Sequence, residues 1–479
     1  MTCPTIKSGD LFSLVTSGSR GWAKYYSASG AAFLRVGNLD HDSISLDLRD
    51  IQRVQPPTGA EGTRTRVQPF DVLVSITADV GMVGLVPEVF EEAYINQHVA
   101  LARPVPTIYP AFLAWYLASP PAQRQFRDMQ RGATKVGLGL DDISAVDVPV
   151  PCAATQRRIV LDIERNLSRI DAGVAALQRV QANLRRYRAA VLKAACEGRL
   201  VLTEAELARR EGRSYETGSQ LLKRVLVKRR ARWSGRGNYA EASLPERADL
   251  PLIPDGWAWT TLDAVAEVKG GITKDQKRKP ARARAVPYLR VANVQRGYLD
   301  LSEMKEILAT EEEISELALE PGDILFNEGG DRDKLGRGWV WGGELPVCIH
   351  QNHVFRARLY DYGLQPKFVS WYANWSGQRF FFDKGKHTTN LASISMSKLR
   401  GLPLPVPPIA EQARIVAEIE RLLSVVDEIT LAVATNLRRS SRLRQSILQR
   451  AFSGALVSQG RDLSCQEDVV RRSGAEGLR

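Results

Sequence analysis

The chain repeats itself, and this duplication limits its possible folds more than any other feature of the sequence. Residues 156–171 return as residues 412–427, and both segments keep the pattern Q-x-R-I-V-x-x-I-E-R-x-L-S-x-x-D. Six further segments return in the same order, so the chain is a tandem duplication. The paired segments are residues 33–39 and 288–294, 68–73 and 320–325, 98–99 and 353–354, 110–116 and 366–372, 148–151 and 404–407, and 198–201 and 454–457.

Each copy begins with a mixed segment of about 150 residues, which is a common size for one domain. Apolar runs typical of β-strands, at residues 71–76 and 323–326, are separated by glycine-rich loops. Short amphipathic helices are expected around residues 112–117 and 368–373. These features predict an α/β or α+β globular domain in each copy.

A single long helix follows each mixed segment. Proline-rich stops precede helices expected at about residues 153–196 and 409–452, and Gly198 and Gly454 follow them. Each helix would be about 66 Å long at 1.5 Å per residue. Eight of ten heptad positions in the first helix and seven of ten in the second are apolar. Such a narrow seam favours a partner helix with a similar seam, and the other copy provides one. The alternative is a helix packed on its own domain, but a domain of this size spans only about half that length.

The charges along the two helices indicate their relative direction. Residues 179–199 carry six basic side chains against one acidic side chain, whereas residues 411–428 carry five acidic and two basic ones. An antiparallel pair sets these opposite charges beside each other, and it also aligns the helix dipoles favourably. We therefore predict two globular domains at opposite ends of an antiparallel two-helix coiled coil, related by a pseudo-two-fold axis.

The duplication divides the chain into six segments. A strongly basic helical stretch at residues 221–233 lies in the joint between the copies, and the end of the chain is polar. The segments are a first globular domain (1–151), a first long helix (152–200), a basic helical linker (201–250), a second globular domain (251–407), a second long helix (408–457) and a mobile tail (458–479).

The overall charge favours a polyanionic partner. The net charge is +12 with a pI near 9.5, which points to nucleic acid first and a membrane surface second, or to a basic surface without a partner. No run of 18 apolar residues is present, so no membrane span is expected. Five scattered cysteines without a C-x-x-C pair and an N-terminus without an apolar signal core fit a cytoplasmic protein.

Residues 402–420, followed by residues 447–456, resemble the helical region shared by the specificity subunits of type I restriction–modification systems. The duplicated plan, with a long helix after each globular domain, is also similar to that family. The resemblance covers essentially residues 1–457. The first copy departs from the pattern at residues 152–155, which read Cys-Ala-Ala-Thr where the second copy has Pro-Ile-Ala-Glu.

The resemblance implies a function and a set of partners. Each globular domain would be a target-recognition domain that reads one half of a split double-stranded DNA target. The paired helices would fix the spacer between the halves and dock two methyltransferase subunits. Those subunits, and not this chain, would bind S-adenosylmethionine, and nuclease/translocase subunits would complete the complex. The chain itself would be a non-catalytic subunit that binds no cofactor.

Basic and aromatic side chains in loops are the candidates for DNA contact, because loops on a rigid scaffold usually carry recognition. Arginine can bond guanine in a bidentate manner, whereas lysine mostly contacts phosphate. The alternative is that these loops are merely solvated. The candidates are Arg20, Trp22, Lys24 and Tyr25 in the first domain, and Lys274, Lys277, Arg278, Arg332, Lys334, Arg337 and Lys386 in the second.

The excess positive charge does not lie on the expected reading domains. Residues 152–250 hold 21 basic and 11 acidic residues, whereas residues 1–151 hold 13 and 15, and residues 251–407 hold 21 and 19. We therefore hypothesise that the helical region, through Arg185, Arg186 and Arg188, helps to hold DNA or partner subunits. Reading would then depend on local clusters in the loops.

Sequence motifs of enzymes that act on DNA are missing. There is no Asn/Asp-Pro-Pro-aromatic motif of adenine methyltransferases and no G-x-x-x-x-G-K-S/T phosphate loop. His350 and His353 have H-x-x-H spacing but lack further ligands, so no metal site is expected. Two other functions stay open: a coiled-coil scaffold that binds only protein, and a nuclease or methyltransferase with an unrecognised site. Methylation by the purified chain alone would support the enzyme, and an assembled complex without sequence preference would support the scaffold.

Overall fold

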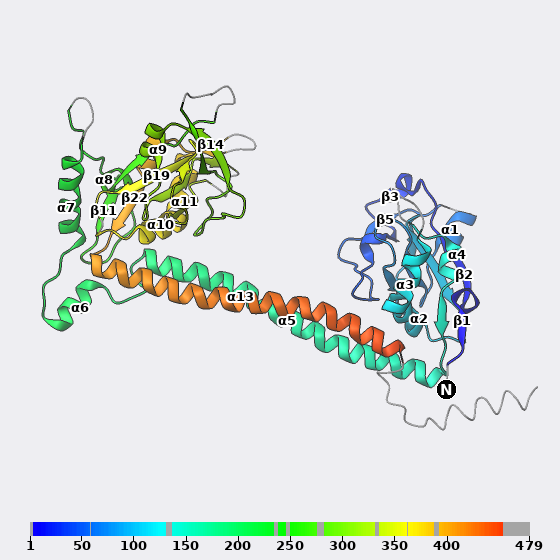
Figure 1. Ribbon diagram of the computed structural model, residues 1–479. Coiled ribbons are helices and arrows are strands. Elements are labelled where there is room, and N and C mark those ends of the chain that lie inside the picture. The colour runs from blue at the N-terminus through cyan, green and yellow to red at the C-terminus, as the bar shows by residue number, and fades with distance from the viewer. Residues whose placement is uncertain are drawn as a thin grey trace, which may run out of the picture. The chain divides into compact units, whose positions relative to one another are not determined.

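The computed structural model describes residues 3–57, 59–130, 137–233, 238–245, 250–274, 282–330, 335–361, 363–387 and 392–453. It consists of two compact units, one formed by Met1–Val180 with Ala432–Arg479 and the other by Gln181–Leu431. Each unit holds one globular domain together with part of both long helices, α5 (Ala153–Cys196) and α13 (Ile409–Phe452) (Figure 1). The sequence predicted these two helices with the same bounds.

The globular domain of the first unit contains two four-stranded sheets. One is antiparallel in the order β2-β9-β6-β7, and the other has the order β3-β5-β4-β8 with β4 and β8 parallel. A separate strand pair, β1 with β10, joins the start of the domain to its end. The strands are β1 (Thr5–Lys7), β2 (Phe12–Ser17), β3 (Tyr26–Ser27), β4 (Ala31–Leu34), β5 (Gln52–Val54), β6 (Val72–Ser75), β7 (Val83–Leu85), β8 (Ala93–Ile95), β9 (Val99–Pro104) and β10 (Asp147–Pro149).

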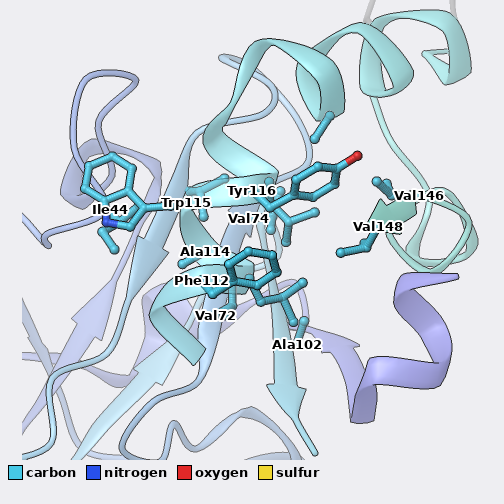
Figure 2. Packing of buried hydrophobic residues seen from close by; sticks show 14 of the residues in the cluster. Ile44, Val72, Val74, Ala102, Phe112, Ala114, Trp115, Tyr116, Val146 and Val148 are labelled. Carbon is cyan, nitrogen blue, oxygen red and sulfur yellow. The ribbon is translucent and has the colours of Figure 1, made fainter. Parts of the chain in front are cut away.

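Helices cover the antiparallel sheet of this domain. Val72, Val74 and Ala102 of the sheet pack in one core with Phe112 and Trp115 of helix α2 (Figure 2). The expectation of an amphipathic helix here is wrong, because the residues of α2 from Ala111 to Leu117 are all buried. The helices are α1 (Ala60–Thr65), α2 (Pro110–Ala118), α3 (Pro120–Met129) and α4 (Leu140–Ser144), with short 3-10 turns η1 (Ser8–Leu11), η2 (Trp22–Tyr25) and η3 (Val36–Asn38).

The globular domain of the second unit repeats this topology. Its antiparallel sheet has the order β12-β19-β15-β17, and its second sheet has the order β14-β13-β18 with β13 and β18 parallel. The strand pair β11 with β22 corresponds to β1 with β10. The strands are β11 (Ala258–Thr261), β12 (Ala266–Lys269), β13 (Arg284–Leu289), β14 (Lys305–Ala309), β15 (Ile324–Asn327), β16 (Gly329–Gly330), β17 (Gly338–Val340), β18 (Ile349–His350), β19 (Val354–Leu359), β20 (Lys386–His387), β21 (Ala392–Ser393) and β22 (Pro403–Val406).

The helices of the second domain also follow the repeat. α10 takes the place of α2, and its residues from Phe368 to Asn374, including the polar Ser370 and Asn374, are also all buried. Three short strands, β16, β21 and β20, form a small additional sheet. The helices are α8 (Leu262–Val265), α9 (Glu311–Leu317), α10 (Pro366–Trp375), α11 (Gly377–Lys384) and α12 (Met396–Arg400).

One buried ion pair recurs in both domains at matching strand positions. Asp71, directly before β6, accepts two hydrogen bonds from Arg103 of β9 at 2.8 and 2.9 Å. Asp323, directly before β15, accepts two from Arg358 of β19 at 2.8 and 2.7 Å. Each pair joins the two central strands of its sheet, so the duplication preserves a detail of the tertiary structure as well as the chain topology.

The two long helices pack against each other in antiparallel directions within each unit. In the first unit, Ile163 near the start of α5 shares a core with Leu448 near the end of α13. In the second unit, Leu192 near the end of α5 shares a core with Ile419 near the start of α13. This arrangement confirms the antiparallel pairing predicted from the helix charges.

A glutamine links each long helix to the globular domain before it. The Gln156 side-chain oxygen accepts a hydrogen bond from the Tyr109 N–H at 2.9 Å, and Gln412 accepts one from the Gln365 N–H at 3.0 Å. Both glutamines are buried and belong to the motif that revealed the repeat. The recurring motif thus ties the start of each helix to the domain before it.

The linker between the copies forms helices α6 (Glu204–Glu211) and α7 (Gly218–Ala231), in agreement with the basic helix predicted there. Part of its positive charge is neutralised within the second unit. Lys228 lies 3.0 Å from Asp361, and the buried Arg229 lies 2.9 Å from Asp263. The tail at residues 458–479, which was expected to be mobile, lies outside the described residues.

Candidate nucleic-acid interface

Three loops of the first domain meet at one edge of its antiparallel sheet. Ser17, the last residue of β2, pairs with Ala100 of β9, and Ser75, the last residue of β6, pairs with Val99. The loops after β2 and β6 and the loop before β9 therefore lie together. A hydrogen bond of 2.5 Å between Thr77 Oγ1 and His98 Nδ1 joins two of them.

The loop after β2 carries the candidate residues of the first domain. A Cβ atom at Gly18 would clash with the backbone of Asn96, so only glycine allows the loop to start so close to β8. Arg20 and Lys24 are exposed on this loop, and the Lys24 ammonium lies 4.8 Å from the centre of the half-buried Tyr25 ring. Both cations are thus accessible to a ligand at this edge, with the partly exposed Tyr25 beside Lys24.

Trp22, by contrast, is part of the core. Its side chain is 2% exposed and stacks on Phe33 with ring centres 5.0 Å apart. It also packs against Tyr25 and Tyr94. Its assignment as a DNA contact is therefore corrected: the buried ring offers no face to a base and supports the loop from below. Tyr26, which is 45% exposed, is the more accessible neighbouring ring.

The second domain has the same arrangement of loops. Lys269 at the end of β12 pairs with Arg356 of β19, and Asn327 at the end of β15 pairs with Val354. The loops that follow these two strands therefore share one sheet edge with the loop before β19. Gly271 corresponds to Gly18, because a Cβ atom there would clash with the carbonyl oxygen of His350 in β18.

The structure places some of the second domain's candidates at this edge. Lys274 is exposed on the loop after β12, and Arg337, half-buried, donates a hydrogen bond to the Val291 carbonyl at 3.2 Å. The backbone of Lys386 lies in β20, and the sheet of β16, β21 and β20 joins it to the loop after β15. The segment that follows β15 and the segment that contains Lys386, which are far apart in sequence, are thereby brought together. Lys277, Arg278, Arg332 and Lys334 lie outside the described residues.

The basic end of α5 divides into paired and exposed side chains. Arg188 lies 2.6 Å from Asp427 of α13, so it belongs to the contact between the two helices. Arg185 and Arg186 are exposed. The hypothesis of a cation cluster for DNA or partner subunits therefore applies to Arg185 and Arg186, and Arg188 is removed from it.

The two histidines with H-x-x-H spacing have separate structural roles. His350 is buried, and burial lowers its pKa to about 4, while its Nδ1 atom lies 2.6 Å from the Val354 carbonyl. His353 is exposed and pairs with Glu328 at 2.5 Å. In the part of the chain that the structure describes, no group of three or more His, Cys, Asp or Glu residues is arranged to hold a metal ion.

The sequence analysis missed one side chain at the sheet edge of the first domain where the three loops meet. Arg64 of α1 donates hydrogen bonds to Thr16, Ser17 and Ser19, where β2 passes into the loop that carries Arg20. No motif or charge run marks Arg64 in the sequence, because its position depends on the packing of α1 beside β2.

Among the described helices, none is both long and apolar enough to cross a membrane.

Known proteins with similar sequences share one description. The chain is 24% identical over 376 residues to the type I restriction enzyme EcoKI specificity subunit of Escherichia coli K12, covering 77% of this chain and 70% of that protein. It is 25% identical over 362 residues to the StySPI specificity subunit of Salmonella potsdam, covering 75% and 68%. No protein-family model matches the chain.

Solved structures with a similar fold cover nearly the whole chain. A chain from a structure of the complex assembly and conformational transition of the type I R-M system matches with a TM-score of 0.59 and 19% identity, over 95% of this chain and all of its own. The HsdS subunit from Thermoanaerobacter tengcongensis matches with a TM-score of 0.50 and 17% identity, over 95% and 97%. These matches show the shared fold.

The fold consists of two similar halves, each with loops gathered at one edge of its sheet. In each half, a loop-bearing domain packs on the start of one long helix and the end of the other. Seven known relatives match the chain, and all are described as type I restriction enzyme specificity subunits, one of them as putative. The chain is similar to the specificity subunits of type I restriction enzymes over about three quarters of its length.

Proposed function

We propose that this chain binds double-stranded DNA and reads a split target, with one half of the target assigned to each globular domain. The observation that carries this proposal is the duplication of the loop-bearing sheet edge. Gly18 and Gly271 hold equivalent loops at equivalent strand ends, yet the two loops differ in sequence. Equivalent scaffolds with different loops are suited to reading two different short sequences.

The chain would act as one part of a larger assembly in the cytoplasm. Two methyltransferase subunits would dock on the antiparallel helices, and these subunits would bind S-adenosylmethionine and modify adenines. Nuclease/translocase subunits would complete the restriction complex. The chain itself would contribute DNA binding and positioning, and no catalytic group. Its exposed loop cations would contact phosphates and base edges, which is how such loops gain affinity and specificity.

The proposal is tested by co-expressing this chain with its methyltransferase partner in a host that lacks DNA methylation and then mapping modified adenines across the genome. A split motif with a fixed spacer, methylated on both strands, is the expected result. An unbroken motif would contradict the assignment of one half to each domain. A confirmed complex that methylates no defined motif would instead favour a protein-binding scaffold, and methylation by the purified chain alone would show that it is an enzyme.

A further inference from the structure

Arg64 links helix α1 to the end of β2 at the point where the first reading loop begins. Its Nη1 atom donates to Thr16 Oγ1 and to the Ser17 carbonyl, both at 2.6 Å, and its Nη2 atom donates to Ser19 Oγ at 2.7 Å. Two of these acceptors belong to the strand and the third belongs to the loop. One planar guanidinium group therefore spans both sides of Gly18.

The geometry of these bonds restrains the loop more than it stabilises the core. A guanidinium group presents its N–H donors in a rigid fork, so three simultaneous acceptors fix the direction of the chain between them. Gly18 is held against the backbone of Asn96, whereas Gly21, with φ of 89°, gives the far side of the loop little stiffness of its own. Arg20, the exposed cation between these two glycines, is positioned by the Arg64 bonds on one side and by the buried Trp22 on the other.

The second domain has a link at the equivalent place with different chemistry. Glu316 of α9 lies 2.6 Å from Lys269 of β12. Glu316 precedes Asp323 by seven residues, as Arg64 precedes Asp71, and Lys269 precedes Gly271 by two, as Thr16 precedes Gly18. The same helix therefore connects to the same strand end in both copies, although none of the side chains that form the link is shared.

We propose that Arg64 in the first domain, and the Lys269–Glu316 pair in the second, are positioning residues that set the register of each reading loop against DNA. This inference rests on the proposed function and assigns a cause of specificity within it. Because each link lies within its own domain, at the strand end from which that domain's loop starts, loss of one link should weaken reading of only one half of the target. Arg64 acts through the loop and needs no contact with DNA.

The test uses the complete complex of this chain with its methyltransferase partner, in wild-type form and with Arg64→Ala, Arg64→Lys or Glu316→Gln. Methylated motifs are mapped, and binding is measured on the wild-type target and on targets with single base changes in either half. We expect Arg64→Ala to reduce discrimination by about 10-fold at positions in one half only, the order of one good base contact. Arg64→Lys should show the same loss, because lysine keeps the charge but lacks the fork. Glu316→Gln should affect the other half.

Three outcomes would overturn the inference. Arg64→Lys with wild-type discrimination would mean that only the charge matters, as for a phosphate contact. A uniform loss of affinity on all sequences with a flatter salt dependence would lead to the same conclusion. If all variants discriminate between the target and altered DNA as well as the wild type does, neither link has a positioning role. If Arg64→Ala fails to fold, Glu316→Gln carries the test in the other domain. A wild-type complex without any sequence preference would contradict the proposed function itself, and is thereby distinguishable from these results.

Discussion

The Nη1 atom of Arg188 in α5 lies 2.6 Å from the Oδ1 atom of Asp427 in α13. The repeat places Arg444 and Asp171 at the equivalent positions, and these two residues also form an ion pair. Each arginine therefore meets the aspartate of the other copy. A parallel helix pair would bring equivalent positions together, arginine beside arginine, so the reciprocal pairing requires antiparallel helices.

Reversal of this pair tests the direction of the helices. We expect Arg188→Asp alone to lower the free energy of unfolding by up to about 1 kcal/mol, since the side chains are 39% and 62% exposed and solvent screens them. Arg188→Asp combined with Asp427→Arg should recover most of this loss. Urea denaturation as a double-mutant cycle, at low and high salt, measures the coupling. Arg185→Asp is the control on the same helix, and a purely additive double variant would contradict the pairing.

The buried ion pair within each sheet should have a larger effect. Asp71→Ala leaves the Arg103 guanidinium without its two acceptors inside the domain, and loss of one partner of a buried pair costs about 3 kcal/mol. Amide hydrogen exchange should show faster exchange in β6 and β9, with the strands of the second domain unaffected. Asp323→Ala should produce the converse pattern. Asp79→Ala, at an exposed carboxylate of the first domain, is the control and should leave exchange in β6 unchanged.

Acid should destabilise the second domain through His350. Burial lowers the pKa of His350 to about 4, below its ordinary value of 6.5, so the folded state binds the proton less tightly than the unfolded state. The contribution of the neutral His350 side chain to the free energy of unfolding is therefore fully present above pH 6.5. It is lost as the pH falls towards 4, by about 3 kcal/mol in all. His350→Gln should reduce the slope of unfolding free energy against pH in this window, measured by denaturant titration. An unchanged slope would show that folding does not lower the pKa of His350.

The exposed cations of α5 provide a separate prediction for the assembled complex. Neutralising Arg185 and Arg186 together should weaken DNA binding by a similar factor on every sequence. If both residues contact phosphates, the slope of log affinity against log salt should become shallower by about 2. Binding measured on target and unrelated DNA over a range of salt concentrations gives both values. A loss confined to one half of the target would exclude a general phosphate contact, and loss of methyltransferase association would assign these residues to subunit docking.

The long helices and their pairing could be predicted from sequence because their signals repeat along the chain. The heptad seam, the prolines before each helix and the glycine after it depend only on neighbouring residues, and they gave α5 and α13 with their observed bounds. A helix was correctly expected around residues 112–117, but the expectation that it is amphipathic was wrong. Its apolar residues face neighbours on all sides, and a short apolar run does not reveal how many of its faces are covered.

The sequence by itself determined the duplication, the mixed class of each domain and the antiparallel helix pair, and it predicted which loops are candidates for DNA contact. All of these follow from periodicity, charge and the order of repeated segments. Only the tertiary structure decided that Trp22 is buried, that Arg188 is paired, that Arg64 links a helix to a loop, and that separate loops share one sheet edge. The physical reason is that the exposure and the partners of a side chain depend on residues brought beside it from distant parts of the chain, and local sequence patterns carry no record of those residues.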